Sequence, residues 1–310
     1  MTRELKHQPL RFVLVVIVSF FLGILTLFYE RIFYSSPSFG TVKDPETFFS
    51  QNPVFLLWAF VSIFQICFAA SITIPLIIEI LSLKRKFKIS FATVAEASAI
   101  VVLLIVLSIV LLLTFGHTQL IEETEGNIID HASFKLHTII CSGYWACFFA
   151  AVAILLLNSC VEEIADRSET DFLDFTSIKE KLQSYLNIFG VVITSSTVAT
   201  FFLQKGIESF YQSKTNFPVE FVYTYALFNT FYISIIYFPV YMNIISTGKK
   251  LVEQKLLKDR KPDDDTQLLL TKRKALLDLM DTQSDYTGWL KKAIPILGPL
   301  ISTLLSFMFK

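Results

Sequence analysis

Five uncharged polar residues lie at similar predicted depths within long apolar stretches, and they are the residues best placed to do chemistry. They are Gln65, Thr194, Thr197, Asn229 and Tyr232. Their amide and hydroxyl groups can hydrogen-bond to water or to a small solute, and polar side chains inside membrane helices often mark pathways. The same groups can instead bond neighbouring helices together, at about 0.6–2 kcal/mol per contact. The sequence leaves both interpretations open.

Helical spacing gathers most of these residues onto two polar stripes. The first stripe consists of Gly190, Thr194, Thr197 and Gln204, and the second consists of Tyr225, Asn229, Tyr232 and Asn243. Residues three, four or seven positions apart share one face of a helix, so two helices present polar faces. Because no ionisable residue occurs at this depth, we expect passage of a neutral solute, a gated pore or no transport, rather than coupling to protons.

The apolar runs that carry these residues predict membrane-spanning helices. Of the 310 residues, 53% are hydrophobic and 31 are Phe. A helix crosses about 30 Å of hydrocarbon with about 20 apolar residues. Runs of this kind cover residues 12–29, 53–83, 91–115, 134–158, 185–204 and 218–247. We therefore predict an all-α, polytopic membrane helix bundle with six spans.

Local signals predict how these helices pack and begin. The basic turn at 84–88 joins the second and third runs, and we expect the two to form a hairpin on which the fold nucleates. In the fourth run, a track of small residues, Ser142, Ala146, Ala150 and Ala153, would let another helix approach closely. The spacing of Ser177 and Glu180 is that of a capping box, which predicts a helix start near Ser177.

The distribution of Lys and Arg predicts the orientation. If the N-terminus, the turn at 84–88, the loop at 159–183 and the tail at 248–292 lie in the cytoplasm, that side holds 21 of the 27 basic residues. The outer side holds five, and Lys310 is unassigned. Cytoplasmic loops are enriched in Lys and Arg, so we predict an N-terminus inside the cell and a location in the cytoplasmic (inner) membrane.

Two carboxylates near the basic turn resemble a buried acidic pair. Helix rise instead puts both Glu79 and Glu96 at the inner membrane boundary. We expect them to be neutralised by Lys84, Arg85 or Lys88 of the turn.

Several functional classes have no support in the sequence. The outer residues His117, Glu122, Glu123, His131 and His137 follow no compact metal-binding spacing. Since catalytic and nucleotide-binding signatures are also lacking, we expect no enzyme, no cofactor and no metal site. A formal net charge of zero argues against nucleic-acid binding. All four cysteines lie in apolar runs or at their inner ends, so we expect free thiols.

The chain divides into three predicted regions: a six-span domain (1–248), a cytoplasmic helical tail (249–290) and a hydrophobic C-terminal segment (291–310). In the tail, Leu269, Leu276 and Met280 form a narrow apolar stripe. In the last region, the uncharged run 293–309 would rise only about 25 Å as a straight helix. We expect it to re-enter the bilayer from inside or to dock on the inner ends of the spans, with a seventh span as the alternative.

Two functional interpretations follow. The one we expect, with the other as its alternative, is a channel or transporter for ions or small solutes, acting through the uncharged polar layer in mid-membrane. The other is a non-transporting membrane sensor, effector or scaffold that acts through its cytoplasmic helices. The expected partners are the lipid bilayer and either a second copy of the chain or another membrane protein.

Overall fold

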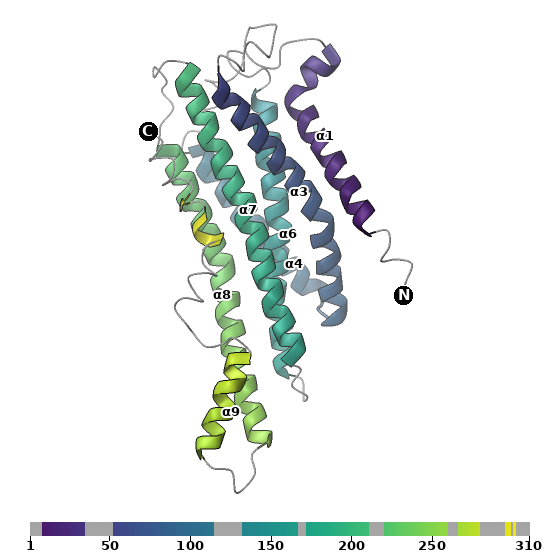
Figure 1. Ribbon diagram of the computed structural model, residues 1–310, viewed down its shortest axis with the longest axis vertical. Coiled ribbons are helices and arrows are strands. Elements are labelled where there is room, and N and C mark those ends of the chain that lie inside the picture. Colours follow the sequence, from purple (N-terminus) through teal and green to yellow (C-terminus); the bar gives the residue numbers. More distant parts are fainter. Residues whose placement is uncertain are drawn as a thin grey trace.

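The computed structural model describes residues 8–34, 52–114, 132–166, 172–210, 220–259, 266–279, 295–298 and 300–301. Its long elements are α1 (Gln8–Tyr34), α3 (Pro53–Lys86), α4 (Phe91–Thr114), α6 (Ala132–Asp166), α7 (Phe172–Phe210), α8 (Glu220–Asp259) and α9 (Thr266–Leu279). Figure 1 shows an elongated bundle with α9 beside the lower end of α8. Apart from Asn52 and the turn at 87–90, the described residues are helical, so the all-α class of fold is as predicted.

Five of these helices, α3, α4, α6, α7 and α8, are long and apolar enough to cross a membrane. The described apolar stretch of α1, Val13–Phe28, is shorter than those five, and α1 has non-helical backbone angles at Phe28. Helix length and hydropathy therefore support a multi-pass membrane protein. The sixth span and the orientation stay predictions.

Helix α6 lies at the centre of the bundle and contacts α3, α4, α7 and α8. Its small residues Ala146, Ala150, Ala151 and Ala153 are completely buried, which lets neighbouring backbones come close. The small-residue track therefore makes α6 the common partner. Helix α3 packs on α1, α6 and α7, and α4 packs mainly on α6, whereas α3 and α4 scarcely contact each other. The two helices therefore do not pack together as the expected hairpin, and the place where folding nucleates stays a prediction.

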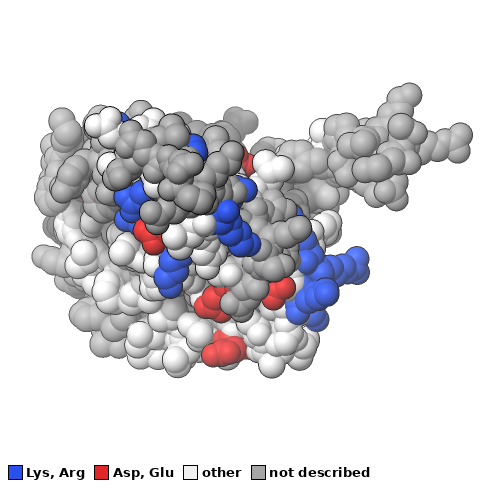
Figure 2. Space-filling model, turned by 90° about the horizontal axis from the view of Figure 1, so that it is seen from below, with Lys and Arg blue, Asp and Glu red and all other residues white. Residues whose placement is uncertain are grey.

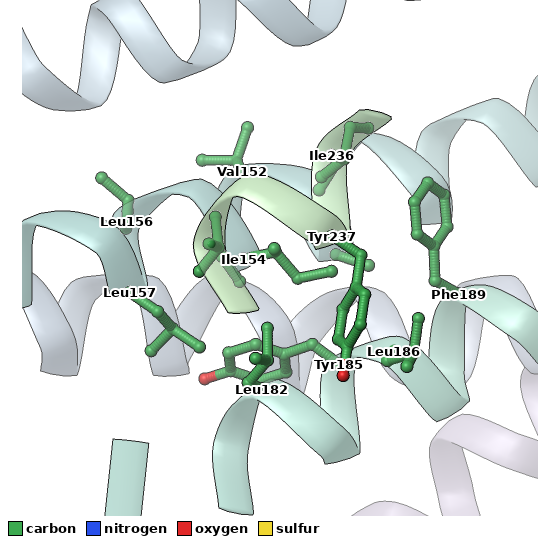
Figure 3. Packing of buried hydrophobic residues seen from close by; sticks show 14 of the residues in the cluster. Val152, Ile154, Leu156, Leu157, Leu182, Tyr185, Leu186, Phe189, Ile236 and Tyr237 are labelled. Carbon is green, nitrogen blue, oxygen red and sulfur yellow. The ribbon is translucent and has the colours of Figure 1, made fainter. Parts of the chain in front are cut away.

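The main core forms where α6 meets α7 and α8. Figure 3 labels side chains of this core from all three helices: Val152, Ile154, Leu156 and Leu157 from α6, Leu182, Tyr185, Leu186 and Phe189 from α7, and Ile236 and Tyr237 from α8. The rings of Phe189 and Tyr232 meet edge to face, with centroids 5.5 Å apart, an arrangement that aromatic pairs favour.

The peripheral helices have large exposed apolar faces. In the most apolar part of α4 only 17% of residues are buried, and Leu103 is 69% exposed. Helix α1 packs on α3, where Gly23 lies against Ile63. A bilayer would cover the outward faces of these helices with lipid.

Helix α7 begins at Phe172, five residues before the predicted start near Ser177. Its first turns carry Phe175, Ile178 and Leu182, all at most 2% exposed. These residues share one helix face, and its burial extends the helix past the local capping signal.

The end of the bundle that carries the turn at 84–88, here named the basic end, holds two ion pairs between α3 and α7. Glu79 pairs with Lys181, and Lys86 pairs with Asp174. The expectation that Glu79 pairs with the turn was therefore wrong, because α7 packs along α3 and supplies the nearer cation. Figure 2, seen from below, shows basic and acidic side chains interspersed on this end.

The other residues assigned to this boundary differ in their surroundings. Glu96 is exposed, and the ammonium of Lys84 lies 5.2 Å from the ring centre of Phe91. On the opposite side, Lys135, which the charge count assigned to the outer surface, is fully buried in α6.

Helix α8 continues without interruption through residue 248, so the predicted domain boundary falls inside a helix. Helix α9 packs on its lower part, where Arg273 of α9 lies 3.3 Å from Glu253 of α8. Leu276 of the predicted apolar stripe packs against the main core together with Leu277. Met280 lies outside the described residues.

Candidate functional site

A small polar cavity lies among α6, α7 and α8. It is lined by Ile140, Gly143, Tyr144 and Cys147 of α6, Val192, Ile193 and Ser196 of α7, and Tyr225, Asn229 and Tyr232 of α8. Its free volume is about 20 Å³, room for about one water molecule.

Helical periodicity explains how three helices build this cavity. On α8, Tyr225, Asn229 and Tyr232 are four and three positions apart, and the α6 residues follow the same pattern. Each helix therefore contributes one face to the cavity. Gly143 has no side chain, so the α6 backbone itself forms part of the wall.

Hydrogen bonds between helices fix two of the cavity tyrosines. The hydroxyls of Tyr225 and Ser196 are 2.7 Å apart and join α8 to α7. The hydroxyl of Tyr144 lies 2.5 Å from that of Ser108, which joins α6 to α4. Both tyrosines therefore serve as interhelical ties as well as cavity walls.

Two other polar groups at the cavity have no hydrogen-bond partner among the described residues. They are the side-chain nitrogen of Asn229 and the hydroxyl of Tyr232, in residues only 4% and 3% exposed. An unsatisfied polar group costs free energy in an apolar medium. A water molecule or a polar ligand atom in the cavity would remove that cost.

The structure brings together two of the five residues predicted to form a polar layer, Asn229 and Tyr232. Gln65 of α3 lies on the other side of the α6 backbone, where its Nε2 donates to the carbonyl of Ile139 at 3.1 Å. A Cβ on Gly143 would lie only 2.8 Å from that Nε2. Gln65 is thus next to the cavity, separated from it by the backbone of Gly143.

The two threonines of the predicted layer have different neighbours. Thr197 is 1% exposed and donates its hydroxyl to the carbonyl of Ile193 in its own helix, at 3.0 Å. Thr194 faces Gly298 of the C-terminal segment. Neither residue lines the cavity.

Sequence reasoning missed Gly143, Tyr144, Cys147 and Ser196. Tyr144 and Cys147 lie in a run whose small residues drew attention to packing alone. Ser196 lies on a different helix face from Thr194 and Thr197, so a stripe drawn through those two threonines at three- and four-residue spacing does not include it. A search for every hydroxyl within the apolar runs would have found Tyr144 and Ser196.

A second polar contact between α6 and α8 lies toward the basic end. The Nδ2 of Asn243 donates to the Oδ1 of Asn158 at 2.7 Å, and Asn158 donates to Glu162 at 2.9 Å. Asn243 belongs to the second predicted stripe. The stripe on α8 thus serves the cavity at one height and an interhelical hydrogen bond at another.

No cluster of three or more His, Cys, Asp or Glu residues suited to a metal ion occurs in the described ranges. Of the outer residues considered for a metal site, His137 has its Nδ1 2.6 Å from the carbonyl of Ser133. The other four lie outside those ranges. All four cysteines are free thiols.

Helix length and hydropathy together define a candidate multi-pass helical membrane protein. No protein-family model, curated protein or solved structure matches the chain. The arguments about function therefore start from the cavity and from the helices around it.

Proposed function

We propose that the protein is a non-transporting membrane sensor or effector in which α8 couples the polar cavity to the α8–α9 helix pair. The observation that carries this proposal is the continuity of α8 from Glu220 to Asp259. One end of this single helix bears three cavity residues, and the other end bears Glu253, which contacts Arg273 of α9.

A continuous helix is a suitable mechanical link. Asn229 and Glu253 are 24 positions apart, or about 36 Å along a helix. Every residue between them is helical, so a shift or rotation at the cavity would move the surface on which α9 rests. Pro239 lies inside the helix between these two positions and removes one backbone hydrogen bond, so α8 can bend there. A shift at the cavity would therefore reach α9 as a swing of the lower half of α8 about Pro239.

The size of the cavity supports a role other than transport. Room for about one water molecule is too little for most solutes, and the surrounding core is closely packed with large apolar side chains. In addition, Gln65, Thr194 and Thr197 lie outside the cavity, so the described polar residues line no common path.

One observation favours the second candidate, a channel or transporter for ions or small solutes. The Asn229 nitrogen and the Tyr232 hydroxyl lack partners among the described residues and would bind a solute that entered between α6 and α8. Passage would require these helices to separate.

The remaining parts of the proposal follow from the charge distribution. The basic end faces the cytoplasm, the membrane is the cytoplasmic membrane, and the N-terminus lies inside. The α8–α9 pair would then meet a partner there, either a second copy of the chain or another protein. The protein is proposed to have no enzymatic activity.

A distance measurement tests the proposed coupling. Spin labels at Arg85 on the membrane domain and Lys274 on α9, both exposed, would report movement of α9 while leaving Arg273 and Glu253 in place. We expect Asn229→Leu to shift their distance distribution. The control is Phe231→Leu, because Phe231 lies on the same helix and its side chain is 60% exposed. This change should leave the distance distribution as it is in the unmodified protein. Identical distributions in the two variants would reject coupling through α8.

A flux assay separates the two candidates. Purified protein in liposomes should leave the vesicles tight to ions and to small neutral solutes if the first candidate is right. Flux above that of empty vesicles, abolished by Asn229→Leu in folded protein, would establish the second instead.

A further inference from the structure

Residues 295–298 of the C-terminal segment contact α7 through two glycines, Gly190 of α7 and Gly298 of the segment. A Cβ on Gly190 of α7 would lie 2.8 Å from the Cβ of Pro295 and 2.9 Å from its carbonyl oxygen. A Cβ on Gly298 would lie 2.6 Å from the Oγ1 of Thr194. Each contact is possible only because one partner has no side chain, so the two surfaces fit each other closely.

The charged residues of α7 give the depth of this contact. Lys181 and Lys205 are 24 positions apart, about 36 Å along the helix, which is close to the thickness of a bilayer core. Thr194 lies 13 positions from the first and 11 from the second. Gly298 therefore lies near mid-membrane, well beyond the inner ends of the spans.

The two contacts also give the direction of the segment. Pro295 lies beside Gly190, and Gly298 lies beside Thr194, so the segment runs parallel to α7 and away from the basic end. Ile296 is 4% exposed and belongs to the main core, whereas Leu297 and Ile301 are 39% and 43% exposed. One side of the segment therefore faces the bundle, and the other side is apolar, as contact with lipid requires.

We propose that Gly190 and Thr194 form an interaction surface for the chain's own C-terminal segment, and that this segment crosses the bilayer completely. Twelve residues follow Gly298, of which only Lys310 is charged. As a helix they would rise about 18 Å, enough to reach the level of Lys205. In the sequence the basic pair Lys291 and Lys292 precedes the described part of the segment and Lys310 follows it, so complete crossing would separate the two sets of charges. This inference is independent of the proposed function.

The first test is an engineered disulfide between positions 194 and 298. A Cβ on Gly298 would lie 3.8 Å from the Cβ of Thr194, which matches the usual Cβ separation in disulfides. We expect Thr194→Cys/Gly298→Cys to cross-link almost completely under mild oxidation, in a background where Cys67 and Cys141 are Ala and the buried Cys147 and Cys160 are kept. The matched control, Thr194→Cys/Leu297→Cys, should stay reduced.

The second test measures the side on which the chain ends. Single cysteines replace Lys274 on α9, which is exposed, or Lys310, and a membrane-impermeant thiol reagent is applied to intact cells and to inverted vesicles. We expect the two positions to be labelled from opposite sides.

Either test can overturn the proposal. Failure of the 194–298 pair to cross-link in protein that elutes as a single folded species would reject the interaction surface. Labelling of positions 274 and 310 from the same side would reject complete crossing, even if the disulfide forms. Because the labelling test leaves Thr194 and Gly298 intact, it remains decisive if the cysteine pair fails to fold.

Discussion

Glu79 of α3 pairs with Lys181 of α7, and Lys86, seven positions later in α3, pairs with Asp174, seven positions earlier in α7. Helix α3 supplies the acidic residue of the first pair and the basic residue of the second, and α7 does the reverse. If α7 slid by two turns along α3, about 10 Å, Glu79 would face Asp174 or Lys86 would face Lys181. Since like charges repel, the two pairs favour a single register between these antiparallel helices.

Reversing one charge of this arrangement should destabilise the fold. We expect Glu79→Lys to lower the free energy of unfolding by about 1 kcal/mol, because the side chains are 30% and 32% exposed and such pairs are worth roughly 0.2–1 kcal/mol. Adding Lys181→Glu should restore most of the loss. Unfolding in mixed micelles provides the measurement.

The matched control for the charge reversal is the more exposed pair Arg273 and Glu253. Arg273→Glu should change stability less than Glu79→Lys does. If Glu79→Lys and the double variant are equally unstable, the pair does not specify the register.

Gly143→Ala should destabilise the bundle by about 1–3 kcal/mol, the usual cost of overpacking. The added Cβ would lie 2.8 Å from the Nε2 of Gln65. Gln65→Ala should also cost stability, because the bond to Ile139 is lost and a cavity forms. In a double-mutant cycle, the double variant should lose clearly less free energy of unfolding than the two single variants lose together. Cys141→Ala, on an exposed position of α6, is the neutral comparison.

Replacing cavity tyrosines by Phe removes one hydroxyl at a time. Tyr225→Phe and Tyr144→Phe each break an interhelical bond and should lower stability by about 0.5–1.5 kcal/mol. Tyr232→Phe should be neutral or slightly stabilising, because its hydroxyl has no partner among the described residues. Thermal unfolding in detergent measures all three. A comparable loss in Tyr232→Phe would mean that a bound water or ligand uses this hydroxyl.

The predicted orientation can be tested with reporter fusions. A fusion after Phe87, beside the basic turn, should report the cytoplasm, because 21 of the 27 Lys and Arg residues are assigned to that side. A fusion after Gly126 should report the exterior. The opposite pattern would invert the whole topology.

The sequence predicted the class of fold because membrane helices leave a strong one-dimensional signal. The lengths of the apolar runs alone were enough to predict the five long helices, and α3 begins at Pro53, where the second run begins. The extension of α7 back to Phe172 was missed, since burial of Phe175 and Ile178 depends on neighbours that are distant in sequence. The pairing of Glu79 with Lys181, 102 positions away, was missed for the same reason.

The candidate site was harder to predict than the fold. Depth along each helix could be estimated from the rise per residue, which is why Asn229 and Tyr232 were selected. The rotation of α7 about its axis could not be estimated, because its four consecutive hydroxyl residues, 194–197, lie around most of the helix circumference. Rotation decides that Ser196 faces the cavity while Thr194 faces Gly298.

The central position of α6 has a consequence for the synthesis of the protein. Helix α4 leaves the ribosome before α6, yet α6 is its main partner. In the interval α4 must lie in the bilayer covered by lipid or by the insertion machinery, whereas α3 can already pack on α1. The core closes only when the alanine-rich face of α6 arrives and α7 and α8 follow. A ribosome that stalls before residue 132 would therefore leave α4 inserted but unassembled, for membrane quality control to remove.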